Sequence, residues 1–296
     1  MSYLIFDWGG TSVKHAVWDG RVLSQHGYFK TPATWTAMKE AMNAVVRDST
    51  HEFQGIAISS PGSVDVQRGV VGGISAIPYI HHFEIVKELE DLFHLPVSIE
   101  NDANCAALAE VWQGVAKDEK DVLFVVVGTG IGGAVILDGK LKRGSQRFAG
   151  EFGCMILDGH ETFSMLATPV HMAERYCNRK GYASDAISGE EVFALAKTDA
   201  LAMEEVSNFY DYLALGLYNL QFTLDPTCIV LGGGVSQYPN LIPELTQRVN
   251  RYLHDAQIKD VVINLKACAF HNHANLMGAV AAHRIQCGGT DHELRG

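Results

Sequence analysis

Hydrophobic residues recur along this chain in two patterns that alternate from one end to the other. Short apolar runs predict buried strands, and apolar residues at every third or fourth position predict amphipathic helices. The expected strands are a hairpin within 4–23, a second hairpin within 122–142, and 55–59, 97–100, 228–234 and 261–265. The expected helices are 35–48, 83–94, 102–116, 188–196, 200–224, 240–253 and 274–285, with a further helix beyond Pro169. Strands alternating with helices in two halves predict an α/β protein with a duplicated core.

Two glycine loops in these hairpins have the same plan: an apolar run, a glycine turn, a second apolar run and then Asp-Gly. A constant offset of 119 residues relates the stretch 4–23 to the stretch 125–142. The superposed pairs include Gly9 with Gly128, Asp19 with Asp138, Gly20 with Gly139, Val17 with Ile136 and Trp18 with Leu137. Glycines let backbone N–H groups approach an anion closely. The repeat therefore predicts two phosphate-binding hairpins that grip a polyphosphate from both sides of a cleft.

The second loop, from Gly128 to Gly133, also matches the GxGxxG pattern of dinucleotide-binding folds. In those folds the loop opens a helix, whereas here AVILDGKL continues as a strand that ends in an Asp-Gly turn. A Rossmann fold is therefore not expected. One glycine loop alone is equally typical of a tight hairpin, but the repeated pair and a third glycine turn at 232–234 favour a nucleotide site.

Composition narrows the class of partner. The chain carries a formal charge of −11 and has no Lys/Arg run, which argues against nucleic acid and anionic membrane surfaces as partners. No apolar run approaches the roughly 18 residues of a membrane span, and no signal peptide is recognised. Six cysteines lie far apart without CxxC or CxxH spacing, so neither a zinc cluster nor a disulfide framework is suggested. We expect a cytoplasmic protein that binds small molecules.

The densest polar cluster spans 100–104, between a predicted strand and an Ala-rich helix. Asp102 as a helix N-cap would account for one residue of the cluster. Glu100 and Asn101 would remain unexplained at the carboxyl end of a strand, where α/β folds usually bind ligands. A carboxylate there could take the proton of an attacking hydroxyl while the neighbouring amide orients it, as phosphoryl transfer requires.

Three further side chains each allow two interpretations. Asp7, at the end of the first strand, could hold Mg²⁺ through water, or could stabilise the turn. Lys14 could complement phosphate charge, or could be a solvated lysine. Glu151, flanked by Gly150 and Gly153, could accept hydrogen bonds from two sugar hydroxyls, or could be a surface residue.

Taken together, the motifs resemble the ROK (repressor, open reading frame, kinase) sugar kinases. The matching stretches are FDWGGTSVK, ISSPGSVD, ENDANCAALAE, VGTGIGGAVILDGKL, AGEFG and VLGGGV, which cover essentially the whole chain. The resemblance implies duplicated actin-like (ribonuclease H-like) ATPase domains with a cleft between them. We expect these domains at 1–117 and 118–296, with the last helix, about 274–287, packing back on the N-terminal domain.

The resemblance also implies roles for individual residues. Asp102 would be the general base that acts on a sugar hydroxyl, normally the 6-hydroxyl. Asp7 remains the metal ligand expected from its place at the end of the first strand. The expected substrate-binding residues are Asn101, Glu151, Gly62 and Cys154. The expected ATP-binding residues are Gly9, Gly10, Thr11, Lys14, Gly128, Thr129, Gly130, Gly132, Gly133, Gly233 and Gly234. The implied cofactors are ATP and Mg²⁺, and by analogy with the family the protein would be a homodimer.

Two departures from the family pattern bear on the sugar. Family glucokinases carry Glu-x-Gly-His and a cysteine-rich zinc segment, whereas this chain reads Glu151-Phe-Gly153-Cys154 and has no cysteine cluster. We therefore expect no zinc and a pocket like that of the zinc-free β-glucoside kinases, with N-acetylmannosamine kinase and glucokinase as alternatives. In the expected sugar-side loop, ISAIPYIHHF replaces the usual Asn-Leu-x-Gly-Trp.

Two other classes of protein stay open: an inactive sugar-binding sensor and an actin-fold ATPase that acts without a sugar. An inactive sugar-binding sensor would keep the fold, although the intact Asp102 and glycine loops argue against it. The family also contains repressors, but these place a helix-turn-helix ahead of the kinase core, and here the first strand begins at Tyr3. A DNA-binding regulator is therefore not expected.

Overall fold

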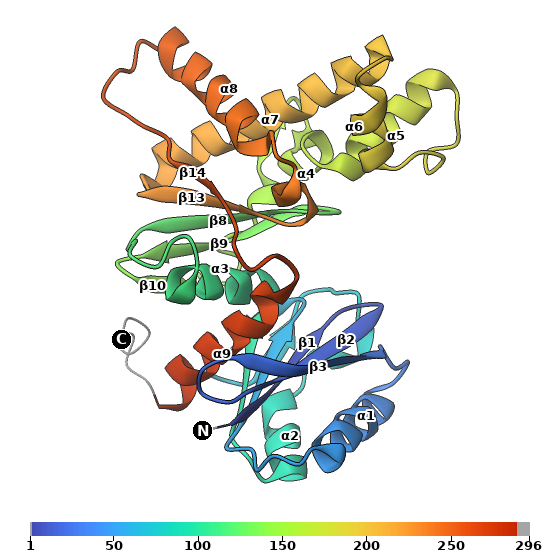
Figure 1. Ribbon diagram of the computed structural model, residues 1–296, viewed down its shortest axis with the longest axis vertical. Helices are drawn as coiled ribbons and strands as arrows, with labels where there is room; N and C mark the ends of the chain where they lie inside the picture. The colour runs from blue at the N-terminus through green and yellow to red at the C-terminus, as the bar shows by residue number, and fades with distance from the viewer. Residues whose placement is uncertain (1, 289–296) are drawn as a thin grey trace. The chain divides into compact units, whose positions relative to one another are not determined.

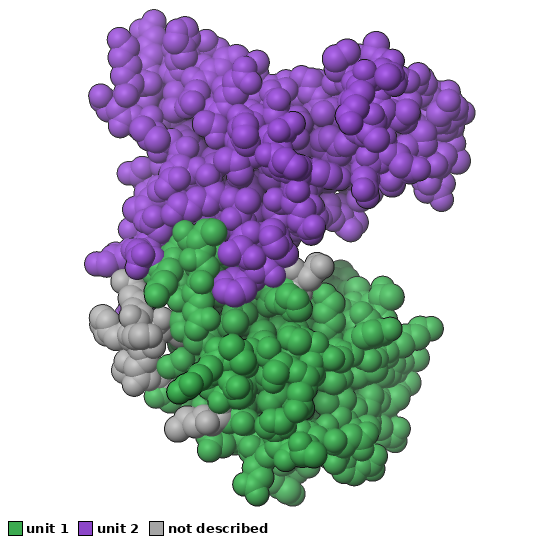
Figure 2. Space-filling view, viewed as in Figure 1, with its two compact units in different colours: residues 1–117, 143–148, 272–296 green, residues 118–142, 149–271 purple. Residues whose placement is uncertain are grey.

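The computed structural model describes residues 2–288, apart from the side chain of Asn272. The chain divides into two compact units (Figure 2). Unit 1 comprises Met1–Lys117, Arg143–Phe148 and Asn272–Gly296, and unit 2 comprises Asp118–Lys142 and Ala149–His271. Each unit is built around one five-stranded sheet (Figure 1).

The sheet of unit 1 has the strand order β3-β2-β1-β4-β7. Its strands are β1 (Tyr3–Trp8), β2 (Ser12–Trp18), β3 (Leu23–Lys30), β4 (Ile56–Ser60) and β7 (Val97–Asn101). The first three strands pair antiparallel as a meander, and β1, β4 and β7 run parallel. Because parallel neighbours end at the same edge, β4 and β7 bring their carboxyl ends together.

Helices cover both faces of this sheet. They are α1 (Trp35–Asp48), α2 (Ile85–Phe93), α3 (Asp102–Gln113) and α9 (Ala274–Cys287). On one face of the sheet, Met38 and Met42 of α1 and Leu89 of α2 are fully buried. These side chains form part of the core of unit 1. Helix α9 packs against α3 and against β1, β4 and β7 on the other face (Figure 1).

The sheet of unit 2 has the corresponding order β10-β9-β8-β13-β14. Its strands are β8 (Val122–Val127), β9 (Ile131–Leu137), β10 (Lys140–Lys142), β13 (Cys228–Gly232) and β14 (Leu265–Ala267). Its helices are α4 (Phe163–Leu166), α5 (Pro169–Lys180), α6 (Gly189–Leu195), α7 (Ala200–Leu224) and α8 (Leu241–Asp255). The shared strand order of the two sheets confirms the predicted α/β class with a duplicated core.

The repeat is real but contains a shift of one residue. Strands β1 and β8, and strands β2 and β9, begin and end 119 positions apart. In the first hairpin Trp8 pairs with Val13, whereas in the second Val127 pairs with Ile131, so the second loop is one residue shorter. The ladder consequently makes Val135, and not Ile136, the counterpart of Val17. The predicted alignment of β2 with β9 at a constant offset of 119 is therefore wrong by one residue.

Several predicted elements have different bounds in the structure. The run 261–265 is not a ladder strand: Val262 is 85% exposed, and β14 begins only at Leu265. Strand β13 ends at Gly232, where a short 3₁₀ helix, Gly234–Gln237, follows. Helix α3 ends at Gln113 because Gly114 caps it.

Some elements were absent from the sequence prediction. They are β3 and two small hairpins, β5 (Ser63–Asp65) with β6 (Val70–Gly72) and β11 (Ile156–Asp158) with β12 (Glu161–Thr162). Strand β3 reads LSQHGYFK, and its exposed polar residues hide the strand pattern. Among residues 2–288, no helix has the length and apolar character needed to cross a membrane.

Candidate active site

The predicted polar cluster lies at the carboxyl edge of the unit 1 sheet. Asn101 ends β7, and its side-chain oxygen accepts the backbone N–H of Asn104 at 3.1 Å, so Asn101 is the N-cap of α3. Its side-chain nitrogen donates to the carbonyl of Gly62 and to Oδ1 of Asp102, both at 3.0 Å. Three of the predicted site residues, Asn101, Asp102 and Gly62, are thus joined by one amide group.

Asp102 is the first residue of α3 and is partly exposed. Its Oδ1 also accepts the backbone N–H of Ala103 at 2.8 Å. The N-terminus of a helix favours negative charge, so the position suits an ionised carboxylate. Because Asn101 makes the cap, the interpretation of Asp102 as a simple N-cap does not explain its place.

Glu100 lies behind this pair and is fully buried. One carboxylate oxygen accepts the backbone N–H of Asn101 at 3.0 Å and the side-chain amide of Asn104 at 2.9 Å. The other oxygen accepts Nε of Arg143 at 2.9 Å. A buried carboxylate needs such partners, and here they hold the last residue of β7 and the first turn of α3 in place.

Asp7 lies near the end of β1 and is 8% exposed. Its Oδ1 accepts Ser59 Oγ at 2.9 Å and the Asn275 side-chain amide at 3.1 Å. Burial raises the pKa of Asp7, and these two hydrogen bonds and the charge of Lys14 oppose the rise. Asp7 and Lys14 face each other as partners in the β1–β2 ladder. A buried carboxylate beside a lysine at a glycine loop fits a Mg²⁺ that keeps most of its own waters.

The first glycine loop is fixed by its own contacts. The Gly9 N–H donates to the carbonyl of Ser12 at 3.1 Å, and the Thr31 N–H donates to the carbonyl of Thr11 at 3.1 Å. A Cβ on Gly10 would lie 2.6 Å from the Cβ of Ala76. The packing of the loop therefore already requires glycine at positions 9 and 10.

Beside this loop, Lys14 lines a hollow of about 510 Å³. The hollow is also lined by Ser12, His15, His26, Gly27, Tyr28, His273 and Leu276. The rings of His26 and His273 lie 5.0 Å apart. One lysine and three imidazoles thus gather next to the first glycine loop, and no carboxylate lines the hollow. Burial lowers the pKa of His15 and of His273, which favours their neutral forms.

Glycines of the second and third loops behave differently. A Cβ on Gly128, Gly132 or Gly234 would meet no atom within 4 Å, and none of the three has a left-handed backbone. Neither packing nor conformation therefore requires glycine there, which leaves the backbone open to an approaching ligand. In contrast, a Cβ would overlap the Phe124 carbonyl at Gly133 and the Val127 carbonyl at Gly233. The predicted loop residues Thr129 and Gly130 are both exposed.

The remaining predicted residues, Glu151 and Cys154, belong to unit 2 and are both exposed. Glu151 precedes the short 3₁₀ helix Phe152–Cys154, and Cys154 is the last residue of that helix. Gly153 of the helix packs against Ile131 at the start of β9. Ser164 Oγ accepts the Ile131 N–H at 2.9 Å. The structure thus places Glu151 and Cys154 beside the second glycine loop.

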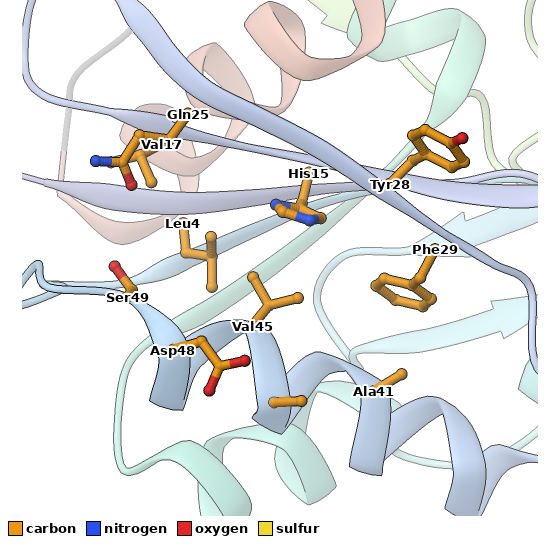
Figure 3. A pocket seen from close by; sticks show the side chains of 11 residues that line it. Leu4, His15, Val17, Gln25, Tyr28, Phe29, Ala41, Val45, Asp48 and Ser49 are labelled. Carbon is orange, nitrogen blue, oxygen red and sulfur yellow. The ribbon is translucent and has the colours of Figure 1, made fainter.

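A cavity of about 440 Å³ in unit 1 has a different character (Figure 3). It lies between the β1–β3 meander and α1, and Leu4, Val17, Phe29 and Val45 give it a mainly apolar wall. None of the predicted site residues lines it. Within the described part of the chain, no three His, Cys, Asp or Glu side chains are grouped to hold a metal ion.

Sequence reasoning missed the residues that hold the site from a distance. Arg143 pairs with Glu100, Arg147 forms an ion pair with Asp65, and Asn275 binds Asp7. Each partner lies more than 40 residues away in the chain, and no local pattern marks it. The adjacent basic residues Lys142 and Arg143 were the available signal, but such a pair also suits an exposed turn.

Comparison with known proteins identifies the family of the chain. The model of the ROK family matches residues 3–284. A β-glucoside kinase from Listeria monocytogenes is 34% identical over 290 residues, which cover 95% of this chain and 96% of the relative. An N-acetyl-D-glucosamine kinase from Vibrio atlanticus is 30% identical and covers 85% of this chain and 90% of its own length.

A solved structure extends the likeness to three dimensions. A ROK family protein from Streptococcus pneumoniae in complex with sucrose superposes with a TM-score of 0.88 at 33% identity, over 97% of this chain and 99% of its own. The predicted actin-like fold of ROK kinases is confirmed. The chain belongs to the ROK family and is a phosphotransferase of the sugar-kinase type.

Proposed function

We propose that the protein transfers the γ-phosphoryl group of ATP to the 6-hydroxyl of a β-glucoside. The observation that carries the proposal is the set of hydrogen bonds that links Asp102, Asn101 and Gly62 at the carboxyl edge of the unit 1 sheet. It combines a carboxylate at a helix N-terminus with a positioned amide and a backbone carbonyl. The names of the relatives as sugar kinases support the same reaction.

Asp102 acts as the general base in this proposal. It accepts the proton of the 6-hydroxyl as the hydroxyl oxygen forms its bond to the γ-phosphorus, and the bond from that phosphorus to the bridging oxygen of ADP breaks. Glu100 is an unsuitable base because it is fully buried and both of its oxygens have partners. Glu100 and Arg143 serve to position Asn101 and Asp102.

In this proposal, polar groups of the chain bind the hydroxyl groups of the sugar. Asn101 and the Gly62 backbone present polar groups next to Asp102, and Glu151 can accept hydrogen bonds from two vicinal hydroxyls. By the resemblance to the family glucokinases, Cys154 takes the place of their histidine, so it would offer a smaller and less polar side chain to the sugar. That difference supports a substrate with a group attached at the anomeric carbon.

ATP would be held by backbone N–H groups of the glycine loops. Gly128, Gly132 and Gly234 support this because their open Cβ positions leave room for phosphate oxygens. Lys14 adds a group that can complement negative charge, and the neighbouring imidazoles add N–H groups that can donate hydrogen bonds. Asp7 would hold Mg²⁺ through water, and the ion would neutralise charge on the transferring phosphoryl group.

The choice of a β-glucoside rests on two observations outside the loops. The Listeria relative named β-glucoside kinase covers almost the whole chain, and the pneumococcal neighbour holds sucrose, a sugar of two rings. The relative named N-acetyl-D-glucosamine kinase supports an N-acetylated hexose as the second candidate. A homodimer, expected from the family resemblance, belongs to the same proposal.

The test is ADP release by the purified protein with ATP, Mg²⁺ and one sugar at a time. The panel contains cellobiose, an aryl β-glucoside, glucose, N-acetylglucosamine and N-acetylmannosamine. We expect the highest kcat/KM on the two β-glucosides. Preference for an N-acetylated sugar would reject the β-glucoside, and silence on every sugar would reject the kinase in favour of a sensor.

A further inference from the structure

Two large apolar side chains are exposed beside the loop that carries Gly62. Ile74 is 97% exposed and Phe148 is 59% exposed. Single exposed apolar residues are common on protein surfaces and need no explanation. These two are unusual because the residue before each of them, Gly73 and Arg147, lies against the same residue, Ser63.

Ile74 reaches Ser63 through the β5–β6 hairpin. Ser63 pairs with Gly72 in that hairpin, and a Cβ on Gly73 would lie 3.6 Å from the Cβ of Ser63. Gly73 has a left-handed backbone with φ of +74°, so the chain turns sharply just before Ile74. The exposed side chain therefore stands on a defined turn.

Phe148 reaches the same residue from the segment Arg143–Phe148. Ser63 Oγ donates to the carbonyl of Arg147 at 3.5 Å, and the Arg147 guanidinium pairs with Asp65. Arg147 also has a left-handed backbone, with φ of +64°, which is unfavourable for a residue with a side chain. The ion pair and the hydrogen bond fix this conformation, so Phe148 is presented to solvent from an anchored loop.

A short set of contacts connects this surface to the base. Asn101 bridges Asp102 and the carbonyl of Gly62, and Ser63 follows Gly62 directly. In a hexopyranose the anomeric carbon and C5, which carries the 6-hydroxymethyl group, flank the ring oxygen, so a substituent at the anomeric carbon begins within one ring's width of the 6-hydroxyl. When the 6-hydroxyl meets Asp102, such a substituent would begin close to the segment of Gly62 and Ser63, where the exposed apolar side chains lie.

We propose that Ile74 and Phe148 form a platform for the aglycone of the β-glucoside. The inference rests on the proposed function and adds which part of the chain selects the substrate. Phe148 packs its ring against the second sugar ring or aryl group, and Ile74 adds apolar contact. Glucose, which has only a hydroxyl at this position, does not use the platform.

The experiment compares kcat and KM for 4-nitrophenyl β-D-glucoside, cellobiose and glucose. The variants are Phe148→Ala, Ile74→Ala and Phe148→Tyr, with Val262→Ala as the control because Val262 is exposed but belongs to unit 2. We expect Phe148→Ala to raise the KM for the aryl glucoside about tenfold with kcat retained. Glucose kinetics should stay within about twofold, Phe148→Tyr should behave as the parent, and Ile74→Ala should show a smaller rise.

Different failures have different meanings. A parallel loss on glucose and on the glucosides, or no change in either, overturns the platform while the kinase stands. No turnover of any glucoside by the unaltered protein overturns both the platform and the choice of β-glucosides. The behaviour of the parent protein therefore separates the two proposals.

Discussion

At the scale of single residues, the site combines one accessible carboxylate with one that is enclosed. Asp102 is partly exposed at the start of α3, and Glu100, two residues earlier, is fully buried. Glu100 lies within β7, whereas Asp102 begins α3, so the change from strand to helix at Asn101 separates the two environments. The roles follow from that separation, because only the exposed group can meet a substrate.

We predict that Asp102→Asn lowers kcat by about 10²–10⁴-fold, the usual contribution of a general base, with little change in sugar affinity. Asparagine keeps the shape and can still bond to its neighbours, but it cannot accept the proton. Steady-state kinetics together with calorimetric sugar binding would measure both quantities. Asp91→Asn, an exposed change in α2, is the matched control, and a near-parental rate for Asp102→Asn would reject the assignment.

At the scale of elements, mutation can distinguish two kinds of glycine in the β8–β9 hairpin. One kind, such as Gly128, has space for a Cβ, and the other, such as Gly133, does not. We predict that Gly128→Ala changes the free energy of unfolding by less than about 0.5 kcal/mol, because its Cβ meets no atom within 4 Å. The same methyl group would occupy the space needed by a phosphate, so the KM for ATP should rise about tenfold, or ~1.4 kcal/mol. Urea unfolding and ATP kinetics provide the two measurements.

Gly133→Ala is the comparison within the same loop. Its Cβ would overlap the Phe124 carbonyl, so we expect a loss of about 1–3 kcal/mol in unfolding free energy. If Gly128→Ala proved as destabilising as Gly133→Ala, or if it left the KM for ATP unchanged, the proposed role of the open glycines would be wrong.

Local sequence patterns predicted most elements because the residues that cap them and the apolar residues that they bury are close together in the sequence. Helix α1 has the predicted bounds, and α6 begins at the Ser188–Glu191 capping box, because their caps and apolar faces are local. The prediction of a strand at 261–265 was wrong because an apolar run does not specify a ladder partner. Strand β3 was not predicted because many of its residues are polar. Asp102, Asn101 and Gly62 could be proposed from sequence, whereas Arg143 and Asn275 depend on contacts across the chain.

At the scale of the whole molecule, stability should respond to one buried histidine. His283 of α9 is 2% exposed, and its Nδ1 lies 2.8 Å from Ser98 Oγ. Its other neighbours are the Tyr3 ring, at 4.7 Å between centroids, and the Cys287 thiol. Burial lowers the pKa of His283 to about 4. The folded protein therefore keeps this imidazole neutral over a range in which the unfolded chain, with a pKa of about 6.5, is protonated.

The sign of the pH effect follows from proton binding. Between about pH 6.5 and pH 4 the unfolded state binds more protons, so stability from His283 is complete above this window and falls as the pH is lowered through it. The slope approaches about 1.4 kcal/mol per pH unit. We predict that His283→Gln reduces this slope in urea unfolding, whereas His254→Gln, at an exposed site, does not. Identical slopes in parent and His283→Gln would contradict the prediction.

The one-residue difference between the hairpins has a consequence for recombination of the two halves. In unit 1, Val13 and Val17 of β2 point into the core, and their ladder counterparts in β9, Ile131 and Val135, belong to the core of unit 2. A chimera aligned by the constant offset of 119 would put residues 9–12 in place of 128–131 and pair Val127 with Gly132, which would invert every side chain of β9. An exchange that preserves folding must therefore follow the ladder and put residues 9–12 in place of 128–130.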